Sequence, residues 1–159
     1  MKIISHRGNI RGPVPDQENR PSYIDCAILG GTQVEVDIRF INDEFWLGHD
    51  TPDYLISSKW IEKRVDSLWF HCKNIEAAQH LNNIHSNVKY FCHTSEPYVS
   101  TNTGLLWVHD ISLPLTERCI VPLLKESDII NYNDKLVHAV CTDYVKLCQF
   151  NLASKGLYA

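Results

Sequence analysis

Val34-Glu35-Val36-Asp37-Ile38 is the stretch that decides the fold, because it alternates β-branched apolar residues with two carboxylates. A run of this length and composition is typical of a strand buried on both faces. Side chains alternate along a strand, so Glu35 and Asp37 share one face. Two carboxylates aimed at one point repel each other, and a cation between them relieves the repulsion best. The stretch therefore predicts a buried strand with a candidate metal site, although a solvated edge strand explains the Glu-x-Asp pair alone equally well.

Six further short runs are rich in β-branched or aromatic residues and have the length of buried strands. Together with the first stretch, they occupy residues 3–5, 34–38, 68–70, 89–91, 105–108, 119–121 and 139–141. Segments with helical spacing lie between several of them, at 22–29, after a capping Asn74 as far as His85, and at 125–132. This alternation predicts an α/β fold with a parallel sheet and right-handed crossovers.

Seven strands favour a barrel over an open sheet, but 159 residues are few for a barrel. A typical (β/α)₈ barrel takes about 250 residues, or about 200 at the short end. We therefore expect a compact, shortened TIM-type barrel that lacks a strand or some helices, with a loop at 111–118 in place of a crossover helix. An open doubly wound sheet is the alternative. Residues 1–150 form a single domain in this interpretation, and residues 151–159 form a peripheral C-terminal tail.

Composition and charge restrict the classes of partner. Hydrophobic residues make up 44% of the chain, charged residues make up 21%, and the formal net charge is −4. These values are typical of a packed soluble protein and give no basic face for nucleic acid. The sequence shows no signal peptide, and no stretch approaches the ~18 apolar residues of a membrane helix. The six scattered cysteines then predict free thiols in a reducing cytoplasm. We expect a cytoplasmic protein without nucleic-acid partners or stable membrane insertion, and the sequence carries no indication of oligomeric state.

Most of the predicted strands end in polar residues. These are His6-Arg7, Glu35 and Asp37, His71 and Lys73, His93, His109-Asp110 and Thr142-Asp143. Barrel enzymes place their chemistry at the carboxyl ends of the strands, so these side chains should converge on one rim. A single strand-end histidine is more often a hydrogen-bonded structural residue than a catalyst. The collective pattern favours a functional site without identifying the reaction.

Motifs in the first 50 residues are more specific. In order, they are His6-Arg7-Gly8, Glu18-Asn19 followed by Arg20-Pro21-Ser22-Tyr23, Ala27-x-x-Gly30, the stretch 34–38, and Gly48-His49-Asp50. Val140-Cys141-Thr142-Asp143-Tyr144 adds a match near the other end of the chain. At these spacings the motifs resemble the glycerophosphodiester phosphodiesterase family, whose members are barrels of the phosphatidylinositol-phospholipase-C-like type. The resemblance brackets the chain, whereas its middle is divergent and shortened.

The resemblance implies a role for each matching residue. His6 and His49 correspond to the general acid/base pair, Arg7, Glu18, Asn19 and Lys73 to substrate-binding residues, and Glu35 and Asp37 to ligands of one divalent metal ion (Mg²⁺, Ca²⁺ or Mn²⁺). The third metal ligand of the family is a Glu two residues before the lysine, and His71 occupies that position here. Because imidazole also binds metals, we expect His71 to be the third ligand, with an altered metal preference.

These matches predict a metal-dependent phosphodiester hydrolase that acts on a small glycerophosphodiester-like substrate in lipid metabolism. The metal and Arg7 would screen the charge of the phosphodiester, and histidine, with a pKa of ~6.5, transfers protons in both directions near neutral pH. The family implies attack by a neighbouring hydroxyl of the substrate's glycerol, which gives a cyclic phosphate. Two alternatives remain: a degenerate barrel that binds phosphorylated ligands without turnover, and a phospholipase of the sphingomyelinase D type.

Overall fold

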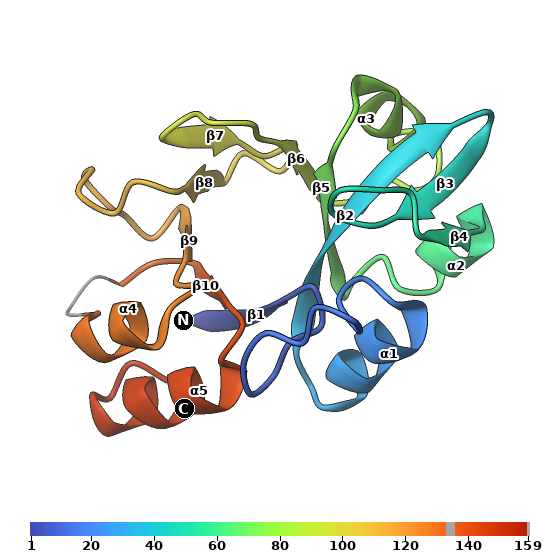
Figure 1. Ribbon diagram of the computed structural model, residues 1–159. Helices are drawn as coiled ribbons and strands as arrows, with labels where there is room; N and C mark the ends of the chain where they lie inside the picture. Colours follow the sequence, from blue (N-terminus) through green and yellow to red (C-terminus); the bar gives the residue numbers. More distant parts are fainter. Residues whose placement is uncertain (133–135, 159) are drawn as a thin grey trace.

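A curled sheet of parallel strands organises the computed structural model, which describes residues 1–132 and 136–158 (Figure 1). Across the sheet, the parallel strands follow the order β6-β5-β2-β1-β10-β9-β8. Their bounds are β1 Lys2–His6, β2 Gln33–Ile41, β5 Leu68–Cys72, β6 Tyr90–Cys92, β8 Leu106–Val108, β9 Cys119–Pro122 and β10 Ala139–Thr142. Each of the runs predicted as strands overlaps one of these strands, so the α/β class and the parallel sheet are confirmed.

Three antiparallel strands bring the described sheet to ten strands, and none of the three was predicted from the sequence. β3 (Glu44–Leu47) pairs with β2, β4 (Tyr54–Ile56) pairs with β3, and β7 (Tyr98–Ser100) pairs with β8. The β2–β3 hairpin turns at Asn42 and Asp43, which both have positive φ. Two successive residues with positive φ are typical of a type I′ turn, which matches the twist of a hairpin.

Helices cover the outer face of the sheet in two groups. α1 (Pro21–Leu29), α2 (Ser58–Glu62) and α3 (Ile75–Leu81) pack against β2 and β5, whereas α4 (Glu126–Asn131) and α5 (Val145–Ser154) lie side by side near the N-terminus (Figure 1). Asn74 caps α3 as predicted, because its side chain accepts a hydrogen bond from the backbone N–H of Ala77. Among the described residues, no helix is long and apolar enough to cross a lipid bilayer.

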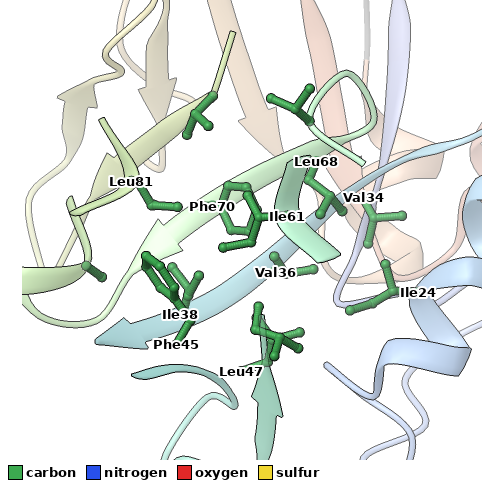
Figure 2. Close-up of a cluster of buried hydrophobic side chains, with 14 of the residues drawn as sticks. Ile24, Val34, Val36, Ile38, Phe45, Leu47, Ile61, Leu68, Phe70 and Leu81 are labelled. Carbon is green, nitrogen blue, oxygen red and sulfur yellow. The ribbon is translucent and has the colours of Figure 1, made fainter. Parts of the chain in front are cut away.

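The outer face of β2 fixes the direction of its carboxylates. Figure 2 shows Val34, Val36 and Ile38 in a buried cluster with side chains of β5, α1 and α2. These three residues alternate with Glu35 and Asp37 along the strand. A shift of one residue would expose the apolar set and bury the carboxylates among the helices, so packing of the outer face holds the register.

The inner face of the curl carries an apolar layer followed by a polar layer. Ile4, Trp69, Phe91 and Trp107 belong to one buried inner cluster. Each is followed two positions later, on the same face, by a histidine: His6, His71, His93 and His109. The carboxyl ends of the strands are therefore polar because the hydrophobic core ends one layer below them.

Side chains and a hairpin bring the two edges of the parallel sheet together. In the described part of the chain β6 and β8 are not paired as strands, but the rings of Phe91 and Trp107 stack with centroids 4.0 Å apart. Asn102, which follows β7, donates its backbone N–H to the carbonyl of Tyr90 at 3.0 Å. From β8 the chain reaches β9 through a loop without a helix, as predicted for 111–118. The structure thus shows a strongly curled sheet, and among the described strands it shows no closed TIM-type barrel.

The predicted domain boundary at residue 150 falls inside α5, which runs to Ser154. Leu152 is fully buried in the cluster formed by β1, β9, β10, α4 and α5, whereas Phe150 on the same helix is 75% exposed. The first residues of the segment that we separated as a tail therefore contribute to the core.

This placement predicts that Leu152→Ala lowers the free energy of unfolding by about 2–5 kcal/mol, because it leaves a cavity in a packed cluster. Phe150→Ala is the matched control on the same helix and should change the free energy by less than about 0.5 kcal/mol. Urea unfolding of both variants measures the difference. Equal losses in the two variants would show that α5 is not packed as described.

Candidate functional site

A cavity of about 710 Å³ lies at the carboxyl ends of the parallel strands. Six of the nine predicted site residues line it: His6, Arg7, Glu35, His49, His71 and Lys73. The other three, Glu18, Asn19 and Asp37, contact Arg7 or one another. The structure therefore brings all the predicted residues to one place, although they come from five separate segments of the chain.

Glu35, Asp37 and His71 form the centre of this site. Their ligand atoms all lie within 4.8 Å of one another, because β2 and β5 are paired with Asp37 opposite His71. His71 Nδ1 lies 3.2 Å from Asp37 Oδ1 and 3.7 Å from Glu35 Oε1. On the other side of the ring, Nε2 donates a hydrogen bond to the carbonyl of His93 at 3.0 Å. Because that carbonyl can only accept, the proton of neutral His71 belongs on Nε2, and the lone pair of Nδ1 faces the carboxylates.

Basic and amide side chains contact the carboxylate of Asp37. Arg7 Nε lies 2.9 Å from Asp37 Oδ2, and Lys73 Nζ lies 3.8 Å from Oδ1. Asn19 donates from Nδ2 to Asp37 Oδ2 and accepts the backbone N–H of Asp37 at Oδ1, both at 2.9 Å. Arg7 also contacts Glu18 Oε2 through Nη1 at 3.2 Å. Arg7 and Asn19, which both lie between β1 and α1, thus hold the carboxylate of Asp37 in one orientation.

Burial and the contacts just described have opposing effects on the pKa values of Asp37 and His71. Burial disfavours the charge of Asp37, but hydrogen bonding from His71 and the charge of Arg7 outweigh it and hold the pKa of Asp37 well below its usual range. For Glu35, burial and the charge of Asp37 raise the pKa. Burial alone would lower the pKa of His71, yet its bond to Asp37 and the charge of Glu35 raise it. The carboxylate pair therefore attracts positive charge, from protons or from a metal.

His6 is held by Asp143, which the strand-end pattern placed on the rim without a specific role, and through Asp143 by Asn9, which the sequence did not single out. Its Nδ1 donates to Asp143 Oδ1 at 2.8 Å, and the side chain of Asn9 donates to the same oxygen at 2.7 Å. This contact leaves Nε2 of His6 on the side of Glu35, 3.9 Å from Oε2. Burial would lower the pKa of His6, but the hydrogen bond to Asp143 and the charge of Glu35 raise it.

His49 lies on the loop after β3, and Arg39 holds that loop. Arg39 donates to three backbone carbonyls: to His49 at 2.6 Å, to Thr51 at 3.2 Å, and to Gly48. Gly48 has a φ of +145°, and an added Cβ would collide with the carbonyl of Thr51. His49 Nδ1 donates to Asp50 Oδ1 at 2.7 Å. Both candidate acid/base histidines therefore use Nδ1 to contact a carboxylate and keep Nε2 for other partners.

Signals for the missed residues were present in the sequence. Arg39 continues the alternation that places Glu35 and Asp37 on one face, and Asp143 ends the last strand in the same way as the other polar residues. Asn9 directly follows His6-Arg7-Gly8 and is fully buried. What the sequence alone lacked was the pairing of β1 with β10, which brings Asp143 beside His6.

Comparisons of the chain with protein-family models, with curated proteins and with solved structures found no match. The family resemblance based on the sequence motifs therefore remains a prediction, and the function has to be argued from the geometry of the site.

The contact between His6 and Asp143 predicts a pH-dependent stability in the presence of a chelator. Protonated His6 stabilises the fold below its unfolded pKa of ~6.5, and this stabilisation is lost as the pH rises through the raised folded pKa. Asp143→Asn removes the charge that favours protonation. The variant should therefore lose more unfolding free energy at pH ~5.5 than at pH ~8.5, as measured by urea unfolding.

Asp25→Asn is the control for this measurement. Asp25 pairs with Arg64, whose Nε lies 2.6 Å from Oδ1, and arginine stays charged across this pH range. Its loss of stability should be the same at both pH values. If the loss for Asp143→Asn is also independent of pH, the contact with Asp143 does not govern the protonation of His6.

Proposed function

We propose that this chain is a metal-dependent phosphodiester hydrolase that acts on a small glycerophosphodiester-like substrate, built on a shortened TIM-type barrel. One observation carries the proposal: two histidines that contact carboxylates through Nδ1 line the same cavity as two basic side chains and as Glu35 and His71 of the Glu-Asp-His cluster. This combination provides for anion binding, charge screening and proton transfer in one place. The sequence motifs that resemble the glycerophosphodiester phosphodiesterases support the same conclusion, and the six free thiols support a cytoplasmic location.

The cluster of Glu35, Asp37 and His71 fits a divalent metal ion. Among the described residues, Glu35 Oε2 is buried without a hydrogen-bond partner, and Asp37 Oδ1 has none when His71 is neutral, because the lone pair of Nδ1 then faces it. A buried acceptor without a partner is costly, and a cation offsets that cost. These residues would hold the ion, which would supply positive charge beside a non-bridging phosphate oxygen.

The charges around the cavity also favour a divalent ion. The ion-pair network contains four carboxylates, Glu18, Glu35, Asp37 and Asp143, but only two basic side chains, Arg7 and Lys73. When all of these groups are ionised, two negative charges remain uncompensated. A phosphodiester would be repelled by that excess, so a site for this substrate needs additional positive charge.

Arg7 and Lys73 bind the substrate phosphate in this proposal. Two nitrogens of the Arg7 guanidinium, Nε and Nη1, contact Asp37 and Glu18, which fix the plane of the group. The donors of Nη2 remain for phosphate oxygens, which the guanidinium binds as charge-assisted hydrogen bonds. Glu18 and Asn19 act through Arg7 and Asp37 and are positioning residues.

His6 and His49 transfer the protons. With Nδ1 donating to a carboxylate, each ring presents a basic Nε2, so one can deprotonate the attacking hydroxyl while the other, protonated, delivers a proton to the leaving alkoxide. The family resemblance implies that the hydroxyl belongs to the substrate's glycerol and that the product is a cyclic phosphate, which water then opens.

A binding protein without turnover is the second candidate. The observation that favours it is that Arg7, Asn19 and His71 already contact the carboxylate of Asp37, which satisfies much of its charge in the absence of a metal. Such a site could hold a phosphorylated ligand by Arg7 and Lys73 alone. Turnover separates the two candidates.

Turnover of glycerol p-nitrophenyl phosphate, a diester whose glycerol carries the neighbouring hydroxyl, tests the proposed enzyme directly. The wild type should release p-nitrophenol with added Mn²⁺ or Mg²⁺ and should stop when the metal is chelated. His6→Ala and His49→Ala should each lower the rate at least ~100-fold, the usual scale for a general acid or base. His80→Ala is the control, because His80 lies on α3, outside the cavity.

Binding of a phosphorylated ligand without turnover under any metal would support the binding protein instead. Full activity in His6→Ala or His49→Ala would show that the acid/base pair is wrongly assigned.

The presence of a histidine at position 71 predicts an unusual order of activity with different divalent metals. Imidazole suits Mn²⁺ or Co²⁺ better than Mg²⁺, which favours oxygen ligands. We expect higher activity with Mn²⁺ or Co²⁺ in the wild type, and we expect His71→Glu to shift the preference toward Mg²⁺. His109→Glu adds a carboxylate to the same cavity outside the cluster and should leave the order unchanged. An unchanged order in His71→Glu would mean that His71 contacts only a water molecule or the substrate.

A further inference from the structure

Two cysteines face each other across adjacent strands at the rim of the cavity. Cys72 ends β5 and Cys92 ends β6, and the two residues are direct partners in the parallel ladder. Cys72 is buried in the outer cluster, whereas Cys92 is exposed. Both are free thiols and both line the cavity. None of the steps proposed for hydrolysis uses them.

The geometry of the pair suits a disulfide. Adjacent strands lie about 4.7–4.9 Å apart, within the range of about 4.4–6.8 Å between the Cα atoms of a disulfide. Directly paired residues point to the same face of a sheet, so the side chains of Cys72 and Cys92 lie on one side of it. In the described residues β6 has three residues and pairs with β5 alone, so its end can move the short distance that bond formation requires.

We propose that Cys92 and Cys72 form a peroxide-sensitive modification site, in which a reversible disulfide links the carboxyl ends of β5 and β6. Cys92 first loses its thiol proton, and the thiolate then attacks one oxygen of hydrogen peroxide. The O–O bond breaks, Cys92 becomes a sulfenic acid, and the leaving hydroxide takes up the released proton as one water. The sulfur of Cys72 then attacks the Cys92 sulfur and loses its proton, and the hydroxyl leaves as a second water. Two thiols are oxidised and one peroxide is reduced.

The different environments of the two thiols assign these roles. Exposure lets peroxide reach Cys92, whereas burial protects Cys72 until its partner has reacted. Cys26 is exposed on α1 as well but has no paired cysteine on a neighbouring strand, which makes it an internal control.

The position of the pair connects the modification to the site. Cys72 lies between His71 and Lys73, and Cys92 precedes His93, whose carbonyl accepts the hydrogen bond from His71 Nε2. A bond between the two sulfurs draws the ends of β5 and β6 together and changes that hydrogen bond. Oxidation therefore changes the environment of the His71 ring, whether or not the chain hydrolyses phosphodiesters.

Peptide mapping after peroxide treatment tests the proposal. The reduced, chelated protein is exposed to stoichiometric hydrogen peroxide, alkylated and digested with trypsin. Cleavage after Lys73 and Lys89 separates the two cysteines, so a linked pair of peptides identifies the bond. We expect a Cys72–Cys92 link that dithiothreitol reverses, while Cys26 remains alkylated. In the same samples the NMR signals of His71, assigned with His71→Gln, should shift on oxidation and return on reduction.

Variants make the test specific. Cys92→Ser should abolish the link and leave Cys72 unmodified, whereas Cys72→Ser, or Cys72→Ala if the serine does not fold, should leave an unresolved sulfenic acid on Cys92. Cys26→Ser should form the link as the wild type does. An unmodified Cys92, a sulfinic acid without the link, or equal linkage to Cys26 would overturn the modification site. Unchanged His71 signals in a linked protein would overturn its connection to the site.

Discussion

The burial of two carboxylates side by side on β2 is the constraint on which the rest of the site depends. Glu35 is 3% exposed and Asp37 is fully buried, so neither charge is relieved by water. Strands β1 and β5 flank β2, and they deliver the compensating groups: His6 and Arg7 from one side, His71 and Lys73 from the other. The strand order places these residues close together, although more than 60 positions separate Arg7 from His71 in the sequence. Because an unpaired buried charge costs several kcal/mol, the order of the strands and the composition of the site depend on each other.

The loops around this centre are held in conformations that the backbone does not prefer. Arg7 and Asn19 both have positive φ, at 55° and 62°, which is uncommon for residues other than glycine. Contacts to Asp37 stabilise both of these backbone conformations. The side chain of Arg7 contacts the carboxylate of Asp37, and the side chain of Asn19 bonds both the carboxylate and the backbone N–H of Asp37. Strain of this kind persists only where the surroundings fix it, and it is typical of functional sites. The β1–α1 loop is therefore part of the site and not only a connection.

Strands with a strongly apolar sequence of their own could be predicted from the sequence. Strands and contacts that form only through pairing with distant residues could not. Runs such as 34–38 and 119–121 are apolar enough to require burial on both faces, so their strands could be recognised locally. β7 has only three residues, and its central residue is partly buried, so it has no comparable pattern. The Asn42-Asp43 turn lacks the glycine that usually marks a hairpin, which hid β3 and β4. Asp143 was expected on the rim without a specific role, and Asn9 was not singled out, because their contacts exist only once β10 lies beside β1.

The proposed metal and the two partly buried histidines would neutralise the same pair of carboxylates. Without a metal, protonated His6 and His71 supply the two positive charges that the carboxylates lack, which is why both pKa values are raised. A divalent ion would bring the same charge, and its binding to Nδ1 of His71 requires that this proton leave. Acidic solution therefore favours the protonated, metal-free site, and neutral solution favours the metal. A general base is useful only when it is unprotonated, so in the proposed enzyme an ion that completes the charge balance would also leave the imidazole of His6 unprotonated for catalysis.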